Sequence, residues 1–153
     1  MKQIVELTLL QLEEYVRDDP VRPHIPAQER IKTQRKVFAL KEDNQVQAIC
    51  CLAYGRGIPV KEEDLASFGN EEQDEPYVIM PYTIWSYTKG AGRNLLIGIL
   101  ETVRENYCDI PEQYRPRVIT LSPKTETATR FHIRNGARLL SSNAETDNFE
   151  YEI

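Results

Sequence analysis

The second half of the chain alternates between runs rich in β-branched and aromatic residues and segments whose apolar residues recur at helical spacing. Residues 77–88 (YVIMPYTIWSYT) predict a strand, and the segment after them predicts a helix. One apolar face of that helix is made by Leu96, Ile99, Leu100, Val103 and Tyr107. Further strands are predicted at 117–122, 137–142 and 148–153, with a helix over 123–136 that Gly136 ends. The predicted order is therefore strand, helix, strand, helix, strand, strand.

The beginning of the chain predicts a short strand followed by a helix. Residues 3–7 (QIVEL) are the strand candidate, and Thr8 and Gln11 have the spacing of a capping box. We expect the helix that this box opens to reach about residue 17. Three prolines in residues 18–26 (DDPVRPHIP) then forbid regular structure but permit a firm extended loop.

The middle of the chain predicts a second helix and an antiparallel hairpin. Residues 27–36 are compatible with a helix, whose basic residues Arg30, Lys32, Arg35 and Lys36 we expect on an exposed face. Residues 37–55 predict two strands that turn at Glu42-Asp43-Asn44.

Residues 59–76 form a long acidic connection with one helical turn expected at 63–68. Its acidic residues Glu71, Glu72, Asp74 and Glu75 could attract a cationic amine, although a solvated acidic loop is the simpler interpretation.

Composition narrows the class of protein. A chain of 153 residues, 41% hydrophobic and 28% charged, is typical of one globular domain, here residues 1–153. No apolar run approaches the roughly 20 residues that span a bilayer, so no membrane partner is expected. Cys50, Cys51 and Cys108 lack CxxC spacing, which indicates buried thiols in the cytoplasm rather than a metal site. A net charge of -5 argues against nucleic acid and favours a small-molecule partner.

The loop between the strand at 77–88 and the next helix contains Gly90 and Gly92. A loop that enters a helix presents unpaired N–H groups and the positive end of the helix dipole, and so can bind phosphate. A plain structural turn is the alternative. A Walker loop is excluded because Arg93 and Asn94 follow Gly92, and a dinucleotide fingerprint is disfavoured because Leu95 stands where a small residue is required.

Two linked motifs resemble the GNAT superfamily of acyl-CoA-dependent N-acyltransferases. The segment YTKGAGRNLL is similar to the family's cofactor signature, and TETATRFHIRNG (residues 125–136) to its later signature, in the family's order. The resemblance implies an α+β fold with three layers, α/β/α. It also implies a mixed, twisted sheet of six to seven strands whose central strands splay apart.

The resemblance further implies acetyl-CoA as cofactor. The pantetheine arm would lie along Ile84, Trp85 and Ser86 in the gap between the splayed strands. The implied pyrophosphate site is Thr88, Lys89, Gly90, Ala91, Gly92 and Arg93, and Thr125 stands where the family often has a cofactor-binding Asn. Tyr87 departs from the family's Gln or Arg, and Ala137 from its usual aromatic residue.

The family's acid position is occupied by His132. An imidazole there could protonate the departing thiolate, and a histidine at the edge of the core is the alternative. His24 would lie near the acceptor side, where a surface histidine is the simpler interpretation. Which of the strand pairs Ile84/Ser86 and Trp85/Tyr87 lines the acyl pocket stays open.

The resulting functional hypothesis is an N-acetyltransferase acting on a small-molecule or peptide amine. The alternatives are a GNAT-shaped module that binds acyl-CoA with little turnover, and a partner-binding domain whose glycine pair is only a turn. The short closing strand at 148–153 (NFEYEI) is expected to be exposed, which permits a homodimer by strand pairing.

Overall fold

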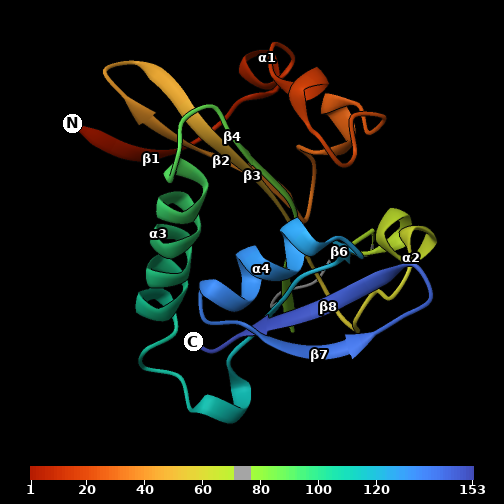
Figure 1. The fold of residues 1–153 in the computed structure, drawn as a ribbon. Coiled ribbons are helices and arrows are strands. Elements are labelled where there is room, and N and C mark those ends of the chain that lie inside the picture. Colours follow the sequence, from red (N-terminus) through yellow and green to blue (C-terminus); the bar gives the residue numbers. More distant parts are fainter. Residues whose placement is uncertain (71–76) are drawn as a thin grey trace.

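The computed structural model describes residues 1–70 and 77–153. Within these residues eight strands form one mixed sheet in the order β1-β2-β3-β4-β5-β8-β6, and β7 pairs with β8 (Figure 1). The strands are β1 (Lys2–Glu6), β2 (Arg35–Glu42), β3 (Gln45–Gly55), β4 (Val78–Ser86), β5 (Arg117–Ile119), β6 (Ser122–Pro123), β7 (Arg138–Ser142) and β8 (Thr146–Tyr151). The helices are α1 (Leu9–Leu12), α2 (Glu62–Ser67), α3 (Ala91–Asn106) and α4 (Glu126–Arg134). Three 3-10 turns are η1 (Val16–Asp18), η2 (Ala27–Glu29) and η3 (Glu112–Tyr114).

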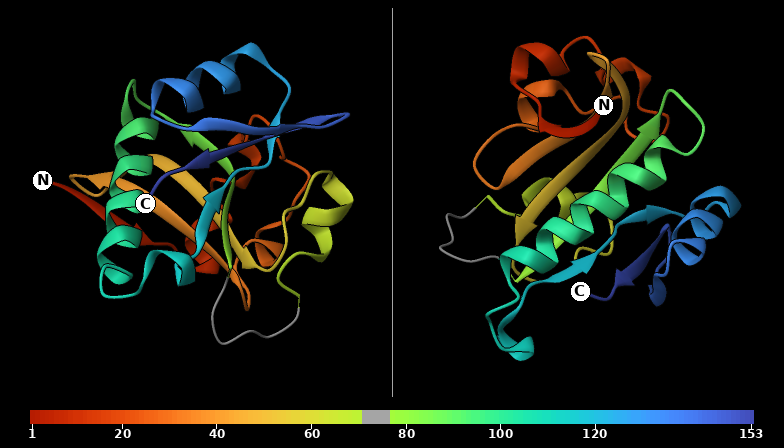
Figure 2. Two further views of the ribbon diagram at one scale, coloured as in Figure 1. Left: turned by 90° about the horizontal axis from the view of Figure 1, so that it is seen from below. Right: turned by 90° about the vertical axis from the view of Figure 1, so that its left-hand side faces the viewer.

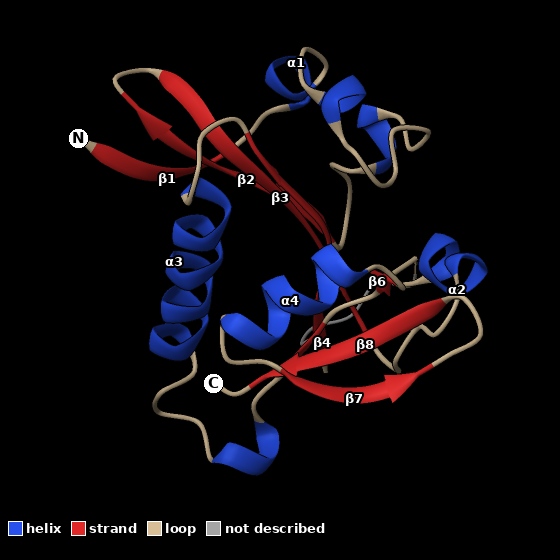
Figure 3. Ribbon diagram, in the orientation of Figure 1, coloured by secondary structure: helices blue, strands red, loops and turns tan. Residues whose placement is uncertain are grey.

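Helices cover both faces of the sheet (Figures 2 and 3). On one face α3 and α4 pack over a core that contains Leu96, Leu100 and Phe149. On the other face α1 and α2 contribute Leu12 and Leu65 to a second core. The predicted α+β class with three layers is confirmed. The sheet has eight strands rather than six to seven, because the two-residue β6 adds a strand.

Three local signals act as predicted. The capping box is formed, since the Thr8 hydroxyl accepts from the Gln11 amide and the Gln11 side chain accepts from the Thr8 amide. Asp43 and Asn44 have φ values of 52° and 67°, which suits the tight turn between β2 and β3. Gly136 ends α4 with a φ of 97°, a conformation that few other residues adopt.

The segment between β1 and β2 differs from the prediction. α1 ends at Leu12 instead of near residue 17, and residues 27–36 form only a 3-10 turn before β2 begins at Arg35. Arg30 and Arg35 do not lie on an exposed helix face, because they are 0% and 4% exposed. Both guanidinium groups can be buried because backbone carbonyls accept their hydrogen bonds. Arg30 donates to the Ile25 carbonyl at 2.9 Å, and Arg35 donates to the Phe68 carbonyl at 3.1 Å.

The closing strand β8 lies inside the sheet. It pairs with β7 on one side and with β5 and β6 on the other. Its edge is therefore not exposed, and the predicted basis for a homodimer by pairing of this strand is wrong.

Cys50 and Cys51 are buried as predicted, whereas Cys108 is exposed because it lies in the loop after α3. Within residues 1–70 and 77–153, no helix has both the length and the apolar character needed to cross a membrane. The acidic residues Glu71, Glu72, Asp74 and Glu75 lie outside the described residues.

Candidate functional site

The parallel strands β4 and β5 are paired only at their beginning. Their register is Val78 with Arg117 and Ile79 with Val118, and no later residues of the two strands pair. We call the gap between residues 80–86 and residues 119–123 the splay. The predicted parting of the central strands is thereby confirmed.

A β-bulge in β4 explains why the strands part. Thr83 faces Cys51 and Pro81 faces Leu52 across β3, so Tyr82 is an extra residue in β4. A bulge bends its strand, and Pro81 has no N–H to donate to a neighbouring strand. β4 therefore turns away from β5 at this point.

The splay exposes backbone groups of β4. The Tyr87 amide bonds the Gln47 carbonyl of β3 at 2.8 Å. Because successive residues of a strand point to alternate sides, the N–H and C=O groups of Ser86 and Ile84 point away from β3 and into the splay. They have the donors and acceptors that an added extended segment would need.

A cleft of about 720 Å³ opens between β4, α3 and α4. Six of the predicted site residues line it together: Ile84, Trp85, Ser86, Gly92, Thr125 and His132. Sequence analysis missed other lining residues, namely Pro20, Val21, Pro81, Tyr82, Thr83, Leu96, Leu121, Ser122, Pro123, Thr127, Ala128 and Phe131. The only local signal among these residues was a proline inside a strand, at position 81. The others come from distant segments that the bulge and the splay bring together.

The other predicted residues form the loop beside Gly92. Gly90 has a φ of 82° and is the N-cap of α3, and the Ala91 amide bonds the Thr88 carbonyl at 3.2 Å. The amides of Gly92 and Arg93 belong to the first turn, where the helix itself provides no acceptor. A Cβ atom built on Gly92 would lie 3.7 Å from Cβ of Ser86, so a larger side chain at this position would fill the space between the first turn of α3 and the end of β4.

The polar side chains of this loop differ in their roles. Arg93 donates from Nε to Asn135 Oδ1 at 3.0 Å and so links α3 to the end of α4. Thr88 donates its hydroxyl to Gln47 Oε1 at 2.7 Å. Lys89 is exposed and has no ion-pair partner among the described residues. Lys89 is therefore a basic side chain of the loop that can contact an anion.

His132 lies on α4 in the wall of the cleft, on the same face as Ala128. It is 8% exposed, its ring stacks on Phe149, and its Nδ1 lies 2.6 Å from the Tyr151 hydroxyl. Burial lowers the pKa of His132 to about 4, so the imidazole is neutral at pH 7. With Nδ1 occupied by Tyr151, Nε2 is the ring nitrogen left for the cleft.

The aromatic pair at the end of β4 is bonded to the N-terminal segment. The Trp85 indole donates to the Tyr87 hydroxyl at 3.0 Å, and that hydroxyl donates to the Asp18 carboxylate at 2.7 Å. Trp85 lines the cleft and Tyr87 does not. Tyr87, which departs from the family motif, therefore acts here on the orientation of Trp85. His24 is exposed and does not line the cleft.

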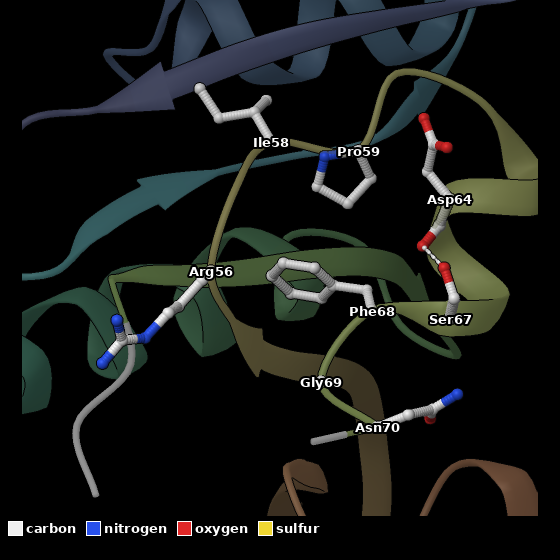
Figure 4. A pocket seen from close by; sticks show the side chains of 8 residues that line it. All are labelled: Arg56, Ile58, Pro59, Asp64, Ser67, Phe68, Gly69 and Asn70. Atoms are coloured by element: carbon white, nitrogen blue, oxygen red, sulfur yellow. Dashed lines mark hydrogen bonds between the residues drawn. The ribbon is translucent and has the colours of Figure 1, made fainter. Parts of the chain in front are cut away.

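A second hollow of about 660 Å³ lies between the end of β3 and α2 (Figure 4). Its polar side chains are already engaged. Asp64 accepts from the Val60 amide at 3.0 Å, Ser67 donates to the Asp64 carbonyl at 3.2 Å, and the Arg56 guanidinium stacks on Tyr77. The hollow contains none of the predicted site residues, so the cleft beside the splay is the candidate site.

No protein-family model and no curated protein sequence matches the chain. Solved structures do match it. A malonyl-CoA decarboxylase from Agrobacterium vitis superposes with a TM-score of 0.76 at 14% identity, over 99% of this chain and 60% of that one. This chain thus spans only 60% of that decarboxylase.

Two acetyltransferases match over nearly their whole length. One is from Bacillus subtilis, solved with CoA, with a TM-score of 0.65 and 9% identity over 99% of this chain and 97% of that one. The other is a GNAT family acetyltransferase from Elizabethkingia anophelis with acetyl-CoA bound, with a TM-score of 0.62 and 11% identity over 99% and 98%. At these identities the likeness is one of fold.

Proposed function

We propose that this chain, which has the GNAT fold, transfers an acyl group from acyl-CoA, in the first instance acetyl-CoA, to an amine. One observation carries the proposal: the splay, with unpaired backbone groups of β4, opens into the same cleft as the uncapped amides at the start of α3. An extended thioester arm needs the first feature and a diphosphate needs the second. A plain structural turn at Gly90 and Gly92 explains neither the splay nor the cleft.

The residues around the cleft suit the parts of acetyl-CoA. Ile84 and Ser86 would bond the pantetheine amides as a neighbouring strand would. The amides of Gly92 and Arg93 would hold the pyrophosphate, with Lys89 contributing charge. Thr125 uses its hydroxyl to cap α4 by accepting from the Ala128 amide at 3.2 Å, so its proposed contact with the cofactor is a secondary one.

The proposed reaction joins the amine nitrogen to the thioester carbonyl carbon and breaks the C–S bond. The proton lost by the amine is taken up by the departing thiolate. A backbone N–H of β4 that points into the splay would stabilise the developing oxyanion, a contribution that can reach about 3 kcal/mol.

His132 is proposed to serve this reaction as a neutral hydrogen-bond donor. Burial raises the pKa of Tyr151, so its phenol keeps its proton, and we propose that the phenol donates a hydrogen bond to Nδ1 of His132. That bond fixes the imidazole tautomer with its proton on Nε2, directed to the cleft. There it can bond the departing sulfur.

The acceptor is proposed to be a small-molecule or peptide amine, and the compartment the cytoplasm. The three cysteines are all free thiols, as is usual in a reducing compartment.

A catalytically weak module that binds acyl-CoA is the second candidate. The low pKa of His132 favours it, because a histidine with a pKa of about 4 is rarely protonated at pH 7 and is a poor general acid.

The test measures thermal stabilisation by CoA and the release of free thiol from acetyl-CoA with a panel of amines. The proposal predicts both stabilisation and amine-dependent thiol release. Stabilisation without thiol release would favour the binding module, and no stabilisation by CoA would overturn both candidates. Malonyl-CoA belongs in the panel because a decarboxylase shares the fold. If the protein releases carbon dioxide from malonyl-CoA in the absence of an amine, the proposed activity changes from acyl transfer to decarboxylation.

A further inference from the structure

Arg22 crosses the splay from the side opposite α3. Its side chain is 2% exposed and comes from the proline-rich loop between η1 and η2. Nη1 donates to the Tyr82 carbonyl of β4, and Nη2 donates to the Leu121 carbonyl, which follows β5, at 2.9 Å. One guanidinium group therefore bonds both edges of the gap.

The carbonyls of Tyr82 and Leu121 each require a hydrogen-bond donor because they are buried. In a continuous sheet the neighbouring strand would provide it, but β4 and β5 stop pairing at Ile79. A buried carbonyl without a partner is costly, and a guanidinium has five donors in a rigid planar fork. Arg22 also donates from Nε to Glu62 at 3.1 Å, which balances its charge.

The depth at which Arg22 enters is fixed by Asp19. Oδ1 of Asp19 accepts from the amide of Arg22 at 3.0 Å and from the hydroxyl of Thr83 on β4 at 2.9 Å. Oδ2 of Asp19 accepts from Arg30 at 2.8 Å, and Arg30 in turn donates to the Arg22 carbonyl. The loop is thus tied to β4 next to the bulge, and its arginine cannot withdraw without breaking this network.

We infer that Arg22 is a strut that holds β4 and β5 at a fixed separation before any ligand binds. It is a positioning residue, because it bonds the strands and not the ligand. The strut belongs to the ligand-free protein. Its consequence for CoA binding rests on the proposed function: a gap of fixed width admits the pantetheine arm without reorganisation.

The test compares Arg22→Met with Arg115→Met. Arg115 also bonds two backbone carbonyls, those of Ile110 and Cys108, but both belong to the single loop between α3 and β5, so its bonds do not cross the gap. Amide hydrogen exchange is measured in the ligand-free proteins at amides that the sheet protects on each edge of the splay, Thr83 and Trp85 of β4 and Thr120 after β5, and in α3. For Arg22→Met we expect exchange at the two edges of the splay to be at least tenfold faster, with α3 unchanged. For Arg115→Met we expect wild-type rates at all three places.

A role limited to general stability would accelerate exchange in α3 as well, and that result, or wild-type rates at both edges in Arg22→Met, would overturn the strut. If Arg22→Met does not fold, the same exchange measurement is made on Arg22→Lys. Its ammonium can reach one carbonyl at a time, so we expect faster exchange at one or both edges, and wild-type rates at both would overturn the strut.

Calorimetric titration with CoA then tests the consequence, with an expected tenfold weaker affinity for Arg22→Met and no change for Arg115→Met. If wild-type protein does not bind CoA, the proposed function fails while the exchange result still stands.

Discussion

The two sides of the splay are built on opposite principles. On the side of α3 and α4, backbone donors at Ser86 and Gly92 have no partner supplied by their strand or helix, and they face a cleft. On the side of the N-terminal loop, Arg22, Asp19 and Arg30 satisfy one another and the strand edges at near-complete burial.

The side of the gap that faces α3 and α4 is therefore open, and the side that faces the N-terminal loop is closed and rigid. Polar groups without partners are tolerated where water or a ligand can reach them, whereas buried ones must be paired. The open side is therefore suited to a changing occupant, and the closed side is suited to holding the strands apart. The following predictions test this division, from the largest expected effect to the smallest.

Breaking the closed side should have the largest effect on stability. Arg30→Met leaves the carboxylate of Asp19, which is 0% exposed, without its ion partner. Removing one member of a buried pair costs about 3–5 kcal/mol, and we expect that loss in the free energy of unfolding measured with urea. Lys32→Met is the control, because its ion pair with Glu29 is largely exposed and should contribute less than about 1 kcal/mol. Equal losses in the two variants would contradict a rigid closed side.

His132 should make stability depend on pH. The unfolded chain binds a proton at this residue below about pH 6.5, but the folded protein does so only below a pKa of about 4. Stability from this group is therefore complete above pH 6.5 and is lost as the pH falls towards 4, by about 3 kcal/mol in total.

Urea unfolding at several pH values between 7 and 4 measures this loss. His132→Gln should lack it, and His24→Gln, at the exposed histidine, should follow wild type. In this range Asp19 contributes little. Burial raises its pKa, but hydrogen bonds from the Arg22 amide and Arg30 outweigh that effect and lower it below 3.8. A wild-type pH dependence in His132→Gln would show that His132 is accessible to protons in the folded protein.

Filling the open side should weaken CoA binding with little effect on stability. Gly92→Val places a branched side chain beside Ser86 and over the amides of the first turn of α3, so we expect about tenfold weaker CoA affinity, or about 1.4 kcal/mol. Gly92→Ala makes only ordinary contact with Ser86, so its affinity should fall less. Gly90 is less suitable because its φ of 82° would add backbone strain to any substitution. Wild-type affinity in Gly92→Val would remove the loop from the binding site.

The smallest effect is expected from the exposed charge. Lys89→Ala should weaken CoA binding by about 0.5–1 kcal/mol at low salt and less at high salt, because an exposed cation is screened. Glu101→Ala, on the exposed side of α3, should leave the affinity at the wild-type value. A tenfold loss in Lys89→Ala would mean that side-chain charge, and not the backbone, dominates the anion site.

The sequence predicted those features that depend on local chemistry. The turn at Asp43-Asn44, the cap at Thr8 and the strand, glycine loop and helix at 77–107 all follow from neighbouring residues. Of these features, the strand, glycine loop and helix at 77–107 build the open side of the splay.

The closed side could not be predicted in the same way. A buried arginine has no hydrophobic periodicity. The carbonyls that bond Arg22 become available only after β4 has parted from β5, and those that bond Arg30 belong to the folded N-terminal loop. The basic residues at 30–36 suggested an exposed helix because the carbonyls that allow Arg30 and Arg35 to be buried cannot be recognised from the sequence. The closing strand at 148–153 was expected at an edge, but it lies inside the sheet. Its pairing with β5 and β7 is set by the topology of the whole sheet, which the residues of the strand do not reveal.

The central claim is that the amides at the start of α3 and along the splayed part of β4 bind CoA. The most direct measurement is a titration of ¹⁵N-labelled protein with CoA, followed through the amide resonances. The account predicts saturable shifts at Ile84, Ser86, Gly92 and Arg93, with smaller changes on β1 and β2. Saturable shifts confined to the hollow beside α2, or no shifts at millimolar CoA, would contradict it.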